Sequence, residues 1–292
     1  MIEPACGGPA GPGIWRRDAD TVVVPPAALP EQNVAPYAIT SGLHVPRVPT
    51  EWSAHTHRLH ELVWVRGGTL TSRVGNRIFT VSEGNGLWMP AGTVHAGRAT
   101  AGARFYGAFL APDRTPLAFG EPTAIAMTPL LESLLTHLSH QGLEAGARTR
   151  AEAVVFDVLR PSERQFALRL PGDARIDAIA ETLLDDPADP RSLEEWARQL
   201  DVSDRTITRA FRRSTGLSFA QWRQALRVHR ALMLLADGFD VTTVSEVLGY
   251  TRPSTFIAAF RRVMGTTPGA FHGAGDSSEE GVPNRVSAVP NC

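Results

Sequence analysis

The C-terminal third of the chain repeats itself, and this repeat constrains the fold more than any other feature. Residues 193–216 align with residues 241–265 at an offset of 48 residues in the first half and 49 in the second. The extra residue falls where a turn is expected, so two copies of one helical unit are predicted. The matching residues are Ala197, Leu200, Ile207, Phe211, Arg212, Arg213 and Gly216 in the first copy, and Ser245, Leu248, Phe256, Phe260, Arg261, Arg262 and Gly265 in the second.

Each copy has the pattern of a helix-turn-helix unit. In the first, Ser192 and Glu195 have the spacing of a capping box, and the small Ala197 allows a second helix to cross closely. A turn follows, and Ser203 is expected to cap a second helix that runs to about Arg213. In the second copy, the expected cap is Thr242 or Thr243, and a proline suits the first turn of the second helix.

The second helix of each unit leaves a polar, arginine-rich face after its apolar residues are assigned to the core. Arginine bonds guanine bidentately or pairs with phosphate, and hydroxyl side chains reach bases or phosphate. The candidate DNA-binding residues are Ser203, Arg205, Thr206, Thr208, Arg209, Arg212, Arg213, Arg252, Ser254, Thr255, Arg261 and Arg262.

The charge distribution agrees with DNA binding. Residues 191–272 contain 12 arginines and 7 acidic residues, a net charge of +5, although the whole chain has a net charge of −1. A basic module on an acidic body is typical of a nucleic-acid-binding protein. The alternative is a plain helical bundle whose arginines are merely solvated.

The last hundred residues resemble the DNA-binding domain of AraC/XylS-type transcription regulators. The resemblance is carried by SLEEWA, by VSDRTITRAFRRSTGLSFAQWRQALRVHRALMLL, by VLGY and by STFIAAFRRVMGTTPGAF. It implies seven helices, with a long helix over about 221–235 joining the two units. The two recognition helices would enter successive major grooves, ~34 Å apart. By this resemblance, double-stranded promoter DNA is the partner, and RNA polymerase is a second expected contact.

The chain departs from the family pattern at two positions. Asp201 stands where glycine is common in the first turn, and Ala258 occupies a position that is often a base-reading arginine. The second unit is therefore expected to depend on Arg252, Ser254 and Thr255 and on phosphate contacts. Base contacts are expected from Arg205 and Arg209, and phosphate contacts from Arg212, Arg213, Arg261 and Arg262.

The N-terminal half has a different pattern. Between residues 37 and 109, short apolar runs alternate with turn signals, which predicts a small β-barrel or sandwich. After residue 123 the apolar period becomes helical over about 130–138 and 151–159. These two helices could bury their apolar faces on the barrel or on a second copy of the chain. The fold class expected is α+β with two domains: a barrel followed by helices, and an all-α double helix-turn-helix domain.

Two stretches of the N-terminal half resemble the two motifs of the cupin barrel. They are residues 55–68, beginning HTHRLHE, and residues 84–95, ending PAGTVH. The resemblance implies that His55, His57, Glu61 and His95 meet inside the barrel, whereas His60 is out of phase. Such a set suits a divalent transition metal: iron, zinc, manganese, nickel or copper. The pattern departs at Pro49, where glycine is expected, and lacks the final asparagine. The alternative is a cavity that has lost its metal and binds an organic effector.

The domain prediction has five parts: a disordered arm over 1–30, a cupin-like sensor domain over 31–122, a helical dimerisation and linker region over 123–172, the double helix-turn-helix domain over 173–272, and a disordered tail over 273–292. The two cysteines, Cys6 and Cys292, lie in the predicted tails, so no disulfide scaffold is expected. No apolar run is long enough to span a membrane, and the N-terminus lacks a signal-peptide pattern.

These observations predict a cytoplasmic, homodimeric transcription regulator whose barrel senses a small molecule or a metal ion, and they leave open whether it is an activator or a repressor. No catalytic residue is predicted. Three alternatives stay open at this stage. The first is a metal-dependent cupin enzyme fused to a DNA-binding domain. The second is a regulator for which the metal ion is itself the signal. The third is a constitutive regulator whose barrel is only a dimerisation platform.

Overall fold

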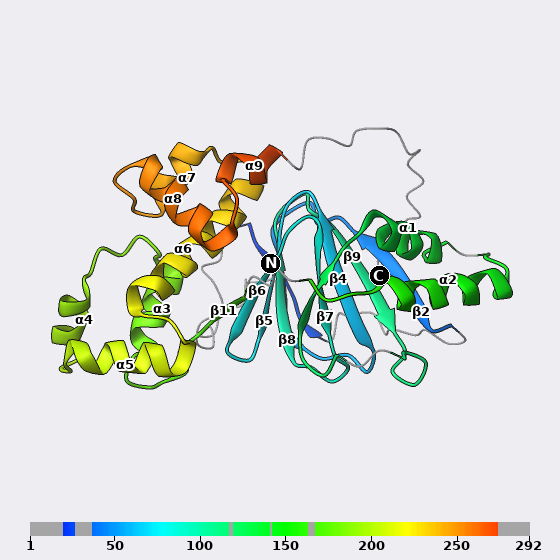
Figure 1. Cartoon of the computed structure of the whole chain (residues 1–292), viewed down its shortest axis with the longest axis horizontal. Helices are drawn as coiled ribbons and strands as arrows, with labels where there is room; N and C mark the ends of the chain where they lie inside the picture. Colours follow the sequence, from blue (N-terminus) through cyan, green and yellow to red (C-terminus); the bar gives the residue numbers. More distant parts are fainter. Residues whose placement is uncertain (1–19, 27–36, 117–118, 141, 163–166, 274–292) are drawn as a thin grey trace, which may run out of the picture.

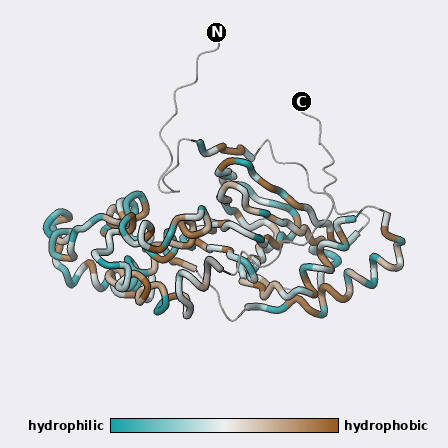
Figure 2. The backbone as a smooth tube through the Cα atoms, turned by 90° about the horizontal axis from the view of Figure 1, so that it is seen from above, coloured by the Kyte–Doolittle hydropathy of each residue, from teal (hydrophilic) through white to brown (hydrophobic). Residues whose placement is uncertain are grey.

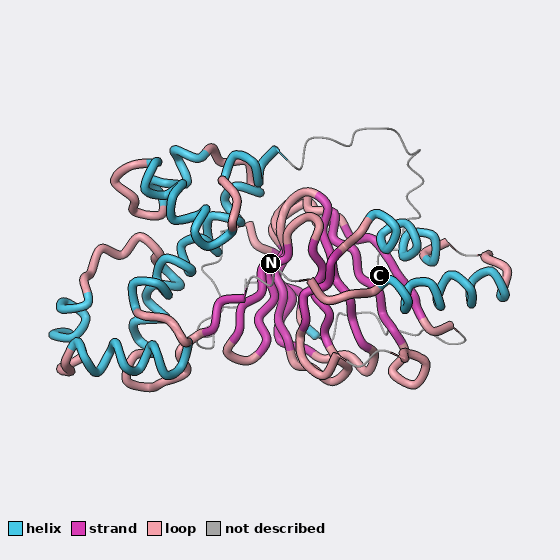
Figure 3. The backbone as a smooth tube through the Cα atoms, in the orientation of Figure 1, coloured by secondary structure: helices cyan, strands magenta, loops and turns pink. Residues whose placement is uncertain are grey.

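The computed structural model describes residues 20–26, 37–116, 119–140, 142–162 and 167–273. Strands occupy the centre of the molecule and helices lie at both ends (Figure 3). The strands are β1 (Val22–Val24), β2 (Ile39–His44), β3 (Thr50–His55), β4 (His60–Arg66), β5 (Leu70–Val74), β6 (Arg77–Val81), β7 (Asn85–Met89), β8 (His95–Ala99), β9 (Arg104–Leu110), β10 (Thr123–Ala126) and β11 (Ala167–Arg169). The helices are α1 (Pro129–Leu138), α2 (Ala145–Val158), α3 (Asp177–Asp185), α4 (Leu193–Gln199), α5 (Asp204–Thr215), α6 (Phe219–Ala236), α7 (Val241–Val247), α8 (Pro253–Met264) and α9 (Pro268–Gly273).

The strands form two sheets that face each other. One sheet has the order β1-β3-β8-β5-β6-β11 and the other β10-β7-β4-β9-β2. Alternate residues of each strand point inward. Apolar inward residues, among them Val63, Phe79 and Leu87, pack together between the sheets as one core cluster. The predicted α+β architecture, with a β-rich first half and a helical second half, is confirmed (Figure 1).

Helices α1 and α2 pack on the outer face of the five-stranded sheet. Leu131, Leu135 and Val155 are fully buried there, in one cluster with Leu62 and Trp64 of β4. Of the two packing partners considered for these helices, the barrel is therefore the one that covers their apolar faces. Figure 2 shows the apolar stretches of this half of the molecule in brown.

None of the described helices is long and apolar enough to span a bilayer.

Three short strands lie where the sequence predicted none. Strand β1 falls within the predicted disordered arm and pairs in parallel with β3, since three consecutive valines suit an edge strand. Strands β10 and β11 fall within the region predicted to be helical, and pair with β7 and β6. At three or four residues, they are too short for periodicity to reveal. The rest of the predicted arm up to residue 30 (1–19 and 27–30) and residues 274–292 of the predicted tail lie outside the described residues.

The described helical half contains seven helices, α3 to α9, and confirms the repeat as two helix-turn-helix units joined by α6. The capping box of Ser192 and Glu195 is present, and α5 begins after Ser203 as predicted. The second unit is capped differently from the prediction. The Oδ1 atom of Asp240 accepts hydrogen bonds from the backbone N–H groups of Thr242 and Thr243, so neither threonine is the cap.

The two turns show why glycine is common at this position. Gly249 in the second unit has φ +72°, and Asp201, 48 residues earlier, has φ +52°. Both values lie in the left-handed region, which aspartate tolerates better than most residues. The first turn therefore keeps its geometry with aspartate in place of glycine.

Strand β11 joins the two halves. It pairs with β6 of the barrel, while its Leu168 belongs to the core of the first helix-turn-helix unit, together with Ile176 and Trp222. The indole Nε1 of Trp222 also donates a hydrogen bond to the carbonyl oxygen of Arg169, at 2.7 Å. The same three residues thus complete a sheet on one side and a helical core on the other.

A buried hydrogen bond reinforces this junction. Thr80 Oγ1 of β6 lies 2.7 Å from His229 Nδ1 of α6, and both residues are buried. Burial lowers the pKa of His229 from 6.5 to about 3, so its ring is neutral at physiological pH. The contact between barrel and α6 therefore requires an uncharged histidine.

This burial predicts an acid-sensitive stability. Because the folded pKa lies below the unfolded value, the unfolded chain binds the proton first, and stability falls as pH drops below about 6.5 towards 3. From about pH 7.5 to 5.5 the expected loss through His229 is about 1.3 kcal/mol. Urea unfolding of wild type and of Thr80→Val/His229→Leu measures it, because the variant removes both polar partners together. The same pH dependence in both proteins would contradict the assignment.

Candidate functional sites

The predicted DNA-binding residues lie on α5 and α8 or, in the case of Ser203 and Arg252, at the N-caps of these helices. The apolar partners Ile207, Phe211, Phe256 and Phe260 are fully buried, as predicted. The remaining predicted residues are exposed or half-buried, and the hydrophilic end of the helical half is visible in teal in Figure 2. The exposed ones are Ser203, Arg205, Arg209, Arg212, Arg213, Arg252, Ser254, Thr255, Arg261 and Arg262, and the half-buried ones are Thr206 and Thr208.

Some of these side chains have partners within the protein. Ser203 Oγ lies 2.9 Å from Thr206 Oγ1 and accepts the backbone N–H of Thr206, so it acts as the helix cap. Arg213 pairs with Asp173 at 2.9 Å. The side chains of Arg205, Arg209 and Arg212 make no hydrogen bond or ion pair with another described residue. Their guanidinium groups are therefore available to a ligand outside the chain.

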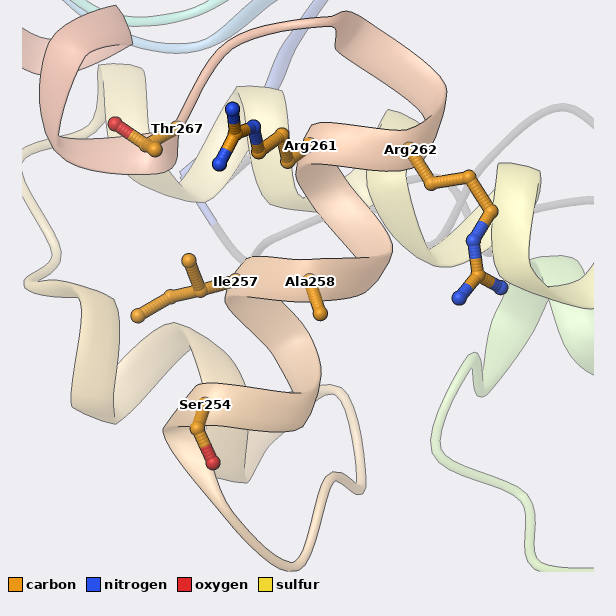
Figure 4. A pocket seen from close by; sticks show the side chains of 6 residues that line it. All are labelled: Ser254, Ile257, Ala258, Arg261, Arg262 and Thr267. Atoms are coloured by element: carbon orange, nitrogen blue, oxygen red, sulfur yellow. The ribbon is translucent and has the colours of Figure 1, made fainter.

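A groove of about 610 Å³ runs along α8. Figure 4 shows Ser254 on one turn of α8, Ile257 and Ala258 on the next, and Arg261 and Arg262 one turn later, towards the C-terminal end of the helix. Arg262 also donates to Gln224 Oε1 of α6 at 3.3 Å. The short side chain of Ala258 leaves the middle of this helix face open. Hydroxyl and guanidinium groups therefore flank an apolar centre.

The second candidate site is a cavity of about 420 Å³ between the two sheets of the barrel. His55, His57, Glu61 and His95 line part of it. The other lining side chains are largely apolar, and none of the described lining residues is an arginine. They include Val45, Trp52, Val63, Leu70, Met89, Phe105 and Phe109, with Thr50, Ser72 and His44 as additional polar groups.

The three predicted histidines converge, and Glu61 lies beside two of them. One ligand nitrogen from each of His55, His57 and His95 lies within 4.8 Å of the others. Glu61 Oε2 is 3.2 Å from His95 Nε2 and 3.7 Å from His57 Nε2. Strand β3 ends at His55 and its pairing with β8 changes register before it, so His57 lies beyond the strand rather than on a shared strand face.

Backbone carbonyls orient two of these rings. His55 Nδ1 is 2.6 Å from the carbonyl oxygen of Ser53, and His95 Nδ1 is 3.0 Å from that of Thr93. A carbonyl oxygen only accepts, so each Nδ1 carries the hydrogen. In the neutral ring, the lone pair is then on Nε2. This tautomer is the one that a metal ion or a hydrogen-bond donor needs.

The charges of the cluster are unequal. Burial lowers the pKa of His55 and of His57 below the ordinary value. Burial also acts to lower the pKa of His95, but its hydrogen bond to Glu61 and the charge of Glu61 outweigh this effect and raise it. Glu61 and His95 therefore form the polar pair of the site: the raised pKa favours a proton on His95 Nε2 facing Glu61 Oε2, which a metal ion would have to displace, whereas burial disfavours the charged form of the other two rings.

The prediction that His60 lies outside the cluster is confirmed. His60 turns away from the other histidines: its Nδ1 accepts the backbone N–H of Ala91 at 3.0 Å, and its ring stacks on Trp88. Trp88 is fully buried in the core on the outer face of the five-stranded sheet, because inward and outward residues alternate along β7.

Sequence reasoning missed several cavity residues. His44 and Phe105, whose rings stack at 5.9 Å, come from β2 and β9, and Trp52 comes from β3. None of them lies in a motif. The inward phase of Trp52 with Thr50 was the available signal, but without the strand pairings it could not be tied to His55.

Comparison with known proteins identifies both halves. Residues 196–273 match the family "Helix-turn-helix domain", and residues 49–151 match the family "AraC-like ligand binding domain". The chain is 31% identical to the HTH-type transcriptional regulator NimR of Escherichia coli over 74% of its own length and 81% of that protein. It is 33% identical to the HTH-type transcriptional regulator RipA of Corynebacterium glutamicum over 78% of its length and 66% of that protein.

A barrel with a ligand-binding cavity joined to a double helix-turn-helix defines a class of DNA-binding regulator, and this chain belongs to the AraC family of transcriptional regulators. Among solved structures, apo ToxT K231A from Vibrio cholerae aligns with 83% of this chain and 98% of its own, at 10% identity and a TM-score of 0.34.

Proposed function

We propose that this regulator senses a small effector in the barrel cavity and that His55, His57 and His95, with Glu61, hold a divalent transition metal there. The observation that carries the proposal is the convergence of three imidazoles and one carboxylate inside a cavity whose other walls are largely apolar. Buried groups of this kind need a partner, and a metal ion or a polar effector group supplies one. Iron, zinc, manganese, nickel and copper all accept such a set.

The donor set fits a metal in its chemistry, and its spacing is somewhat wider than a bound ion requires. Ring nitrogens held ~2.1 Å from one tetrahedral ion lie ~3.4 Å apart. Here they lie within 4.8 Å of one another, so the rings would close by up to about 1.4 Å. The Nδ1–H groups of His55 and His95 already donate to carbonyl oxygens, as ligating histidines do. A bound ion would supply a Lewis-acidic position for an oxygen or nitrogen donor of the effector.

The walls indicate the kind of effector. Aromatic rings and aliphatic side chains dominate the cavity, and Thr50 and Ser72 are its only hydroxyl side chains among the described lining residues. A sugar would find few hydrogen-bond partners there. The cavity suits a small molecule with an apolar body and one polar group that faces the histidines. The same cluster also supports the second candidate, in which the metal ion is itself the signal.

The route from cavity to DNA runs through one pair of strands. On β5, Leu70 and Ser72 line the cavity, whereas Thr71 between them lines the junction with α6. We infer that occupancy of the cavity biases the docking of α6 on β5 and β6, which is a shift between two arrangements of the DNA-binding half. In this proposal the protein acts as a regulator in the cytoplasm and not as an enzyme. Promoter DNA is its main partner, and RNA polymerase is a second.

The DNA-contacting roles divide by position. Arg205 and Arg209 are assigned to bases, and the arginines near the C-terminal ends of α5 and α8, namely Arg212, Arg213, Arg261 and Arg262, to phosphates. For Arg213, DNA phosphate would have to displace Asp173. A homodimer would form through the outer side of α1 and α2, where Leu130 and Val154 remain exposed after the helices have packed on the barrel.

Metal binding is tested on the untagged full-length chain. After incubation with equimolar Zn²⁺ and gel filtration, elemental analysis should find about one ion per chain in wild type. His55→Ala/His57→Ala should lose it because two of the three imidazole ligands are gone. His60→Ala is the matched control and should keep it. Wild type without metal would overturn the ligand assignment, and the four residues would then act as effector-binding groups.

The arginine roles are tested by salt titration of DNA binding. Arg212→Ala should lower the slope of log K against log salt by about one unit and weaken all sequences alike. Arg209→Ala should cost about 1–3 kcal/mol on the preferred sequence and relax the preference at one base pair. The exposed Arg150 of α2 is the matched control. If Arg209→Ala weakens every sequence equally, the base-contact assignment is wrong.

A further inference from the structure

The loop between α3 and α4 bridges the two helix-turn-helix units. It spans residues 186–192 and lies against α6 and the turn of the second unit. Apart from this loop, the two units are connected through α6, which contacts both α5 and α8. In Figure 1, α6 links the α4–α5 pair to the α7–α8 pair. The loop is therefore placed to fix the angle between the units.

Two arginines of α6 hold the loop by its backbone. Arg223 donates from Nη1 to the carbonyl oxygen of Arg191 at 3.0 Å and from Nη2 to that of Asp189. Arg227, one turn later, donates from Nε to the carbonyl oxygen of Pro187 at 2.8 Å. Three loop carbonyls are thus bound to one face of α6. Hydrogen bonds from charged donors are among the stronger ones in proteins.

The first unit is attached to the same loop. Arg191 pairs with Asp189 and donates to Gln199 Oε1 of α4 at 2.6 Å. Its guanidinium carbon also lies 3.6 Å from the ring centroid of Trp196, which is fully buried in the core of that unit. The loop is therefore held to α4 by these contacts, and α4 packs directly on the recognition helix α5.

The second unit touches the loop through its turn. A Cβ atom added to Gly249 would lie 3.0 Å from the carbonyl oxygen of Ala188 and 3.1 Å from its Cβ. Arg227 also lies over the ring of Tyr250, at 5.1 Å from its centroid. The tight turn that precedes α8 thus rests on the loop, and only glycine fits at this contact.

We propose that Arg223 and Arg227 are positioning residues that set the spacing between the two recognition helices by clamping residues 187–191 between the two units. Two donors of Arg223 and one of Arg227 are directed at the protein's own carbonyls. This clamp, formed by Arg223 and Arg227, restricts the spacings between the two contacted DNA segments that the protein can bind. The reason is that both units must enter successive major grooves at once. A rigid link also raises the effective concentration of the second unit after the first has bound.

The test uses the full chain and the DNA sequence that wild type selects from random duplexes. One base pair is then inserted between the two contacted segments, which rotates them by ~34° relative to each other. Wild type should lose about tenfold or more in affinity. Arg223→Met/Arg227→Met keeps the aliphatic packing but not the donors. It should bind the selected sequence more weakly and lose less than about threefold on insertion.

Two further variants separate positioning from other roles. Arg198→Met removes an exposed charge from α4 in the same domain and should keep the wild-type spacing penalty. Gly249→Ala perturbs the same contact from the second unit and should reduce the loss of affinity on insertion, as the double variant does. It provides an independent test if the double variant does not fold. Uniform weakening at every spacing, with a smaller salt slope, would identify phosphate contacts and overturn the proposal. An unchanged penalty in both clamp variants would also overturn it.

Discussion

The pairing of β11 with β6 is the constraint on which the rest of the structure depends. Three residues supply the last strand of the barrel's larger sheet and, through Leu168, part of the first helix-turn-helix core. Moving the helical half as a rigid body would expose that leucine or break the strand pairing. The buried hydrogen bond between Thr80 and His229 adds a second contact that cannot be hydrated without cost. The barrel and the DNA-binding half can therefore adopt only a few relative arrangements. A small number of discrete arrangements is what a switch requires.

The same sheet carries the cavity on its other side. Alternation along β5 places Leu70 and Ser72 inside and Thr71 outside, so cavity and junction are separated by the thickness of one strand. Within the helical half, the arginine clamp on residues 187–191 performs a comparable task, since it ties two units that otherwise meet through α6. A small rearrangement at the cavity would thus reach both recognition helices together.

The sequence predicted best those features whose physics is local. Helix caps such as Ser192 and Ser203, the apolar period of α5 and the repeat itself involve residues a few positions apart. The histidine cluster was anticipated from two motifs, and three of its rings do converge. The features that the sequence did not predict depend on pairing between distant segments: β1, β10 and β11 are too short to recognise alone, and no local pattern links Thr80 to His229. A smaller failure concerns the start of α7, where Asp240 caps the helix instead of the predicted Thr242 or Thr243.

We expect occupancy of the cavity to reach the DNA-binding half through β5, β6 and β11. Amide hydrogen exchange of the full chain, with and without equimolar Zn²⁺, measures this transmission in wild type and in His57→Ala. Metal should change the exchange of β6 and β11 amides in wild type and leave them unchanged in the variant. If metal binds wild type and alters exchange only around the histidines, with β6 and β11 unaffected, occupancy is not transmitted by this route.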